Sequence, residues 1–234
     1  MAGPDPRIEN KRAGSLQGRL ILLLPVQELR CNFRGPRYDP TGSHSIRSSA
    51  SGGIMAAVTL SEEQVEAANE FAHATMKALR SDRGVHAETA VAAASRMAGA
   101  FLFRSFGFVL PNLEPGQYVL SEQANEYGPR LVGLLSSMLS KLGVAVNEAI
   151  AGDPVTADRP QLGVIETQKL LGPEFGAIRE RHKLSLQQAA DAGAVATAIV
   201  LSYCAPVLDP NVAFGVAVTG FIEGTKTAPD PAVG

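Results

Sequence analysis

Apolar residues recur every three or four positions along most of the chain after residue 60, a spacing that predicts amphipathic helices. The clearest case is 61–81, where Ser61 and Gln64 also have the spacing of a capping box. Only 117–120 has a strand-like pattern. The pattern predicts an all-α protein, an irregular bundle of about six helices, with helical segments at 61–81, 86–106, 121–142, 161–171, 174–182, 184–204 and 209–223.

Proline and glycine positions predict where these helices break and end. Gly128-Pro129 is expected to break or kink 121–142, and Gly172-Pro173 to separate 161–171 from 174–182. Asp209 and Pro210 have the order expected at a helix start, whereas Gly143 and Gly224 are expected just after helix ends.

Charged residues are scarce in four regions: 86–106, 131–142, 186–205 and 211–222. Seven of the fourteen residues in 87–100 are alanine, which favours helix. Because a helix that is apolar on nearly all sides is usually buried, we expect 86–106 and the last two helices at the centre and 61–81 outside. In the last two helices, small residues at four-residue spacing should allow close backbone approach: Gly193, Thr197, Gly215 and Thr219.

The hairpin 184–222 contains Asp191 and Asp209 as its only charged residues. Its apolar stretches are 192–208 and 211–222, whereas crossing a bilayer takes about 20 residues. No basic cluster flanks either stretch. We therefore predict burial in protein and a soluble chain, with a membrane-associated hairpin as the alternative.

Residues 1–54 differ from the rest in composition. They contain eight Lys and Arg against four Asp and Glu, a net charge of +4, whereas the whole chain carries −2. The apolar run 20–24 is short and ends at Pro25, which fits a secretory signal poorly. We predict that 1–54 is a disordered basic tail, or an upstream stretch with Met55 as the natural start. A single α-helical domain at 55–228 and a disordered tail at 229–234 complete the expected organisation.

Composition narrows the partners and the compartment. A near-neutral charge argues against a nucleic-acid binder, which would show a basic face. The two cysteines, Cys31 and Cys204, are far apart and form no disulfide framework or zinc motif. We therefore expect a reducing, cytoplasmic location and no nucleic-acid partner.

Two short motifs suggest metals but are incomplete. Glu70-x-x-His73, one turn after Glu66, has the spacing used in di-iron helical bundles, but the chain has no second copy of it. His86-x-Glu88 matches half of the zinc-deaminase signature, and the Pro-Cys-x-x-Cys half is absent. Phosphate-binding and nucleophile-elbow motifs are also absent, and Cys204 is expected to be a buried small residue. The sequence therefore predicts no metal and no cofactor.

Three charged side chains in apolar helices are the candidate ligand-binding residues: Arg96, Arg104 and Asp191. Arg96 and Arg104 are eight residues apart and share one side of their helix. A largely buried arginine needs a partner, and Glu122, Glu126 and Asp191 are candidates. The three residues predict either structural ion pairs or an internal pocket for an anion; catalytic residues cannot be named.

The leading functional hypothesis is a non-enzymatic interaction or scaffold protein that self-associates. A domain of this size is expected to leave some of its charge-poor helical surface exposed, available to a second copy or a protein partner. The alternatives are a helical-bundle pocket for a small apolar or anionic ligand, with or without catalysis, and the membrane-associated hairpin.

Overall fold

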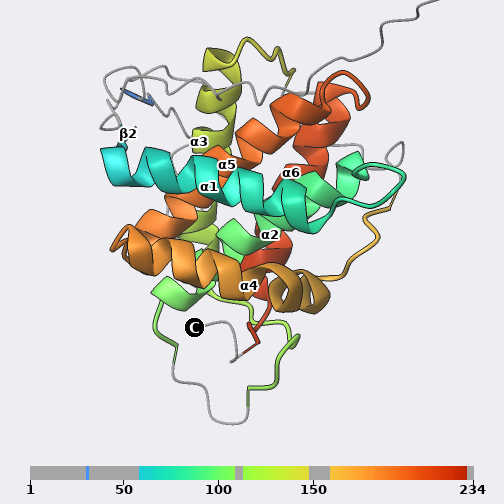
Figure 1. Cartoon of the computed structure of the whole chain (residues 1–234). Coiled ribbons are helices and arrows are strands. Elements are labelled where there is room, and N and C mark those ends of the chain that lie inside the picture. Colours follow the sequence, from blue (N-terminus) through green and yellow to red (C-terminus); the bar gives the residue numbers. More distant parts are fainter. Residues whose placement is uncertain (1–29, 32–57, 109–112, 148–158, 231–234) are drawn as a thin grey trace, which may run out of the picture.

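The computed structural model describes residues 30–31, 58–108, 113–147 and 159–230. Within these residues the fold is all-α, as predicted, with six helices: α1 Glu62–Ala78, α2 Ala87–Ser105, α3 Glu122–Lys141, α4 Val164–Arg181, α5 Leu186–Cys204 and α6 Pro210–Lys226 (Figure 1). A two-residue strand, β1 Arg30–Cys31, pairs antiparallel with β2 Val58–Thr59. Apart from β1, the predicted tail 1–54 lies outside the described residues, as do 231–234.

The predicted helix starts are confirmed by their capping bonds. The Ser61 hydroxyl accepts from the Gln64 N–H at 3.3 Å, and the Gln64 side chain accepts in return from the Ser61 N–H. Ser185 and Gln188 form the same reciprocal pair at the start of α5. Asp209 accepts from the Asn211 N–H at 2.7 Å, so α6 begins at Pro210. These starts are local, which is why sequence spacing predicted them.

Neither Gly-Pro pair interrupts its helix, so the predicted stop before Gly172-Pro173 is wrong, and at Gly128-Pro129 the helix is not broken. Pro129 lies inside continuous α3, and Pro173 lies inside α4, which joins the predicted helices 161–171 and 174–182. A glycine precedes each proline and has no Cβ to clash with the proline ring. In α4, buried Leu171 and Phe175 anchor the helix on both sides of Pro173, so packing offsets the lost hydrogen bond.

Helix α2 is the centre of the molecule, as its composition predicted. Fifteen of its nineteen residues are buried. Helices α5 and α6 both pack against α2 and make few contacts with each other. The last two helices therefore do not pack closely on each other, and the close backbone approach expected from their small residues is made to α2, at Gly193.

Glycines set the distance between α2 and its two neighbours. A Cβ on Gly99 would lie 2.7 Å from the Phe221 carbonyl oxygen and 2.8 Å from the Gly224 Cα. A Cβ on Gly193 of α5 would lie 2.8 Å from the Cβ of Ala98 in α2. Gly224 thus lies within α6, which continues to Lys226, and does not follow a helix end at Glu223 as predicted. Its position is explained by the close approach to α2.

Helices α1 and α4 run antiparallel on the outside of the molecule (Figure 1). Three buried rings connect them to α2. The rings of Phe71 and Phe175 stack with centroids 4.4 Å apart, and Phe101 of α2 lies 5.8 Å from Phe71 and 6.3 Å from Phe175. Aromatic packing against α2 therefore sets the spacing between α1 and α4.

The segment after α6 pairs with the strand-like residues 117–120. Tyr118 and Thr227 form an isolated antiparallel bridge, and the Val119 N–H donates to the Lys226 carbonyl at 2.8 Å. Ala228 continues the pairing with Gly116 and Gln117. The short pattern in the sequence thus corresponds to a local pairing and not to a sheet.

We predict that Gly99→Ala lowers the free energy of unfolding by about 2–3 kcal/mol, because α2 and α6 must separate to admit the methyl group. Urea denaturation followed by circular dichroism measures the change. Thr219→Ala, at an exposed position of α6, is the matched control and should shift stability by less than about 0.5 kcal/mol. Equal effects of the two substitutions would contradict this account of the helix contact.

Candidate functional site

The described part of the chain has a groove between α1 and α4. It encloses about 570 Å³. Five apolar side chains line it: Ala74, Ala78, Leu170, Leu171 and Ile178. Five polar side chains complete it: Asn69, Glu70, His73, Lys77 and Glu174. Leu170 is 45% exposed beside this lining, so the groove presents apolar surface to whatever approaches it.

An ion-pair cluster lies beside the groove and shares Glu70 with its lining. The Glu70 carboxylate pairs with Arg181 through one oxygen, and its other oxygen lies 3.0 Å from His182 Nε2. The opposite ring nitrogen of His182 lies 3.7 Å from Glu66. The cluster connects the end of α4 to the middle of α1. Both carboxylate oxygens of Glu70 are thereby paired within the protein.

The Glu70-x-x-His73 motif is therefore divided between two environments. Glu70 faces Arg181 and His182, whereas His73 is exposed on the groove. In the described ranges, no three His, Cys, Asp or Glu side chains are grouped so that they could hold a metal ion. In this motif, Glu70 takes part in ion pairs and His73 lines the groove.

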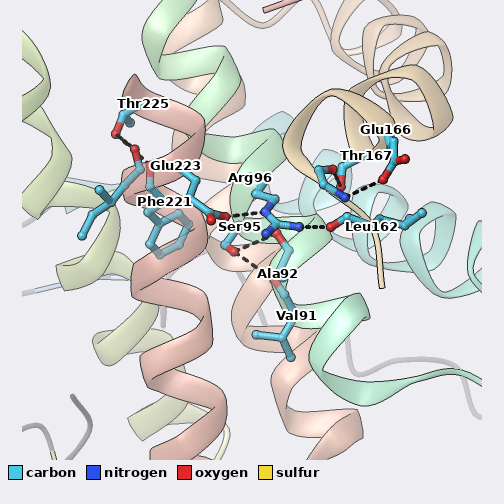
Figure 2. Close-up of polar contacts among 12 residues, drawn as sticks. Val91, Ala92, Ser95, Arg96, Leu162, Glu166, Thr167, Phe221, Glu223 and Thr225 are labelled. Carbon is cyan, nitrogen blue, oxygen red and sulfur yellow. Dashed lines mark hydrogen bonds and ion pairs between the residues drawn. The ribbon is translucent and has the colours of Figure 1, made fainter. Parts of the chain in front are cut away.

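Arg96 is 7% exposed and forms a structural network in the interior (Figure 2). Its Nε donates to a Glu223 carboxylate oxygen of α6 at 2.6 Å. Its Nη1 donates to the Leu162 carbonyl, just before α4. The same segment is held by Gln161, whose N–H donates to the Thr89 hydroxyl at 2.9 Å. Arg96 thus joins α2, α6 and the start of α4.

Arg104 lies in the last turn of α2, beside the segment that follows α6. Its Nη2 donates to the Asp230 carbonyl at 2.7 Å. Burial, reinforced by the positive charge of Arg179 and opposed by Asp230, lowers the pKa of Arg104. The Asp230 N–H donates to Gln168 of α4 at 2.9 Å, so Arg104 and Gln168 hold the same residue.

Asp191 of α5 pairs with Arg130 of α3 in a bidentate contact. The two hydrogen bonds measure 2.8 and 2.7 Å. The Asp191 side chain is buried, whereas that of Arg130 is partly exposed. The hydrogen bond from Arg130 to Asp191, more than the opposing effect of burial, raises the pKa of Arg130.

The structure therefore gives each of the three candidate ligand-binding residues its own protein partner. Glu223, the Asp230 carbonyl and Arg130 were not among the partners considered from the sequence. Glu223 is distant in sequence from Arg96, and Arg130 is distant from Asp191. Only the folded structure shows that these residues pair. Whether Arg96, Arg104 or Asp191 also binds a ligand stays a prediction.

The remaining motif residues have structural roles. His86 caps α2, with Nδ1 2.8 Å from the Thr89 hydroxyl and 3.4 Å from the Thr89 N–H. Cys204 is buried, as predicted, and burial raises the pKa of its thiol to about 11. A thiol with this pKa stays protonated near neutral pH, so it is a weak nucleophile.

None of the helices in the described ranges is by itself long and apolar enough to cross a membrane. The pair α4 and α5 meets the length and composition criteria jointly, with a bend of 116° between the two helices.

We predict that Arg96→Met destabilises the protein by about 2–4 kcal/mol, because it leaves the Glu223 carboxylate and the Leu162 carbonyl without their donor. A double-mutant cycle with Glu223→Gln, measured by urea denaturation, should give a coupling of about 1–3 kcal/mol. Arg83→Met, at an exposed position, is the control. A loss no larger than that of the control would refute the structural role of Arg96.

Comparison with known proteins adds no assignment to this geometry. No protein-family model, no curated protein and no solved structure matches the chain.

Proposed function

We propose that this chain is a non-enzymatic interaction protein that associates with a second copy of itself. The observation that carries the proposal is the apolar surface left outside the core. Seven large apolar side chains are exposed in the described ranges: Tyr118, Leu120, Tyr127, Leu170, Tyr203, Val207 and Ile222. Leu170 of α4 is 45% exposed beside the α1–α4 groove, so association at this face would remove apolar surface from water.

The pairing of charged side chains within the protein also supports association through the outer surface. Arg96, Arg104 and Asp191 all donate to or accept from groups of the protein itself. The core buries most of α2 and α5, so the exposed apolar side chains lie on α3, α4 and α6, near the end of α5, and on connections. Binding through this outer surface needs no rearrangement of the core.

We expect the full chain to show an apparent mass that rises with concentration toward twice that of one chain. Sedimentation velocity over a series from low micromolar to near-millimolar protein measures this directly. Since part of the driving force is burial of apolar surface, the association should persist at high salt. A strict monomer throughout the series would contradict the proposal.

A second candidate is a small oxyanion bound beside Arg104. Gln168 is fully buried, and its amide oxygen accepts from the Asp230 N–H, which leaves the Nε2 donor without a partner in the described structure. Arg104 donates to the carbonyl of the same Asp230, and the positive charge of Arg179 lies close enough to lower its pKa. Buried donors near two guanidinium groups favour a carboxylate or phosphate.

Thermal denaturation with and without inorganic phosphate tests this candidate. Phosphate should raise the melting temperature by about 2–4 °C in the unmodified chain and in Arg83→Gln, and hardly at all in Arg104→Gln. The exposed Arg83 variant has the same change of charge, so it accounts for general effects of the salt. An equal rise in all three proteins would rule out a site at Arg104.

A further inference from the structure

We infer that the α1–α4 groove is the surface on which the second copy docks, an inference that rests on the self-association proposed above. The groove combines an apolar floor packed on the core, an exposed leucine on one rim, and the opposite charges of Lys77 and Glu174 on its two rims. Together these features fit a symmetric contact in which each copy occupies the groove of the other.

The floor of the groove is held by the core. Leu171 and Ile178 of α4 are buried there, while Ala74 and Ala78 of α1 are small and leave the space above them open. Phe71 and Phe175 stack beneath, at a centroid distance of 4.4 Å. A partner therefore meets a preformed surface, which lowers the entropic cost of binding.

The two rims face each other at the same level along the groove. Glu70 contacts Arg181 and His182, and the two helices are antiparallel (Figure 1). Seven residues onward along α1 and seven backward along α4 both cover about 10.5 Å. Lys77 on the α1 rim is thus level with Glu174 on the α4 rim.

Lys77 and Glu174 carry opposite charges and are exposed, and within the described ranges neither forms an ion pair. A two-fold axis parallel to the groove exchanges the rims. Lys77 of one copy then faces Glu174 of the other, and the symmetry repeats this pair. The same operation places Leu170 of each copy within about one turn of Ala78 of the other, over the apolar floor.

The size of this face sets the expected strength. Helices α1 and α4 have 17 and 18 residues and are about 26 Å long, and together they are roughly 20 Å wide. A face of this size is at the small end of specific protein interfaces, which indicates a reversible dimer in the micromolar range. Leu120 and Val207 lie on connections outside the groove and represent the competing surfaces.

Matched leucine substitutions in the full chain distinguish the groove from the other apolar surface. Leu170→Glu should weaken the dimer at least about 30-fold, because it places a charge on both grooves of the symmetric contact. Leu120→Glu introduces the same charge at a more exposed leucine outside the groove and should leave the dissociation constant within about twofold. Sedimentation velocity gives both constants, and circular dichroism checks that each variant is folded.

Reversing the rim charges tests the orientation of the two copies. Lys77→Glu and Glu174→Lys should each weaken the dimer about tenfold, because each creates two like-charged pairs. The double variant, which restores opposite charges, should recover most of the affinity. Since both positions are exposed, neither change should affect folding.

The outcomes separate this inference from the proposed function. A dimer that Leu170→Glu leaves intact, or that Leu120→Glu dissociates instead, overturns the groove assignment while self-association stands. A dimer dissociated by Leu170→Glu but not restored by the double charge reversal overturns the two-fold arrangement. A monomeric unmodified chain removes the proposed function and this inference together.

Discussion

The close packing of α2 against α5 and α6 is the constraint on which the rest of the structure depends. Helix α2 is rich in alanine, and small side chains bury little apolar area unless neighbouring backbones come near. Gly99 and Gly224 allow that approach on the α6 side, and Gly193 allows it on the α5 side. The glycine contacts therefore turn a helix of small residues into a stable centre.

Arg96 of α2 links the packed centre to the outer helix α4. Arg96 is buried where α2 meets α6, and it fixes both Glu223 and the carbonyl of Leu162 (Figure 2). The Leu162 segment leads into α4, whose Phe175 stacks on Phe71 of α1. The position of the outer groove is thus set by a chain of contacts that begins in the core.

Charges in this protein have two distinct uses. The Arg96–Glu223 and Arg130–Asp191 ion pairs neutralise charges inside or at the edge of the core, where an unpaired charge would be costly. Lys77 and Glu174 lie on the groove rims, exposed to water. The first group specifies how the helices pack, and the second is available to orient a partner, because exposed charges affect specificity more than stability.

The sequence by itself determined the features that depend on neighbours along the chain. Capping at Ser61, Ser185 and Asp209 needs only residues within three positions, and the burial of α2 follows from its composition. Tertiary structure alone decided that α4 continues through Pro173, that Gly224 serves a helix contact, and that Asp191 pairs with Arg130. These outcomes depend on residues brought together from distant parts of the chain, and neither periodicity nor spacing records which residues will meet.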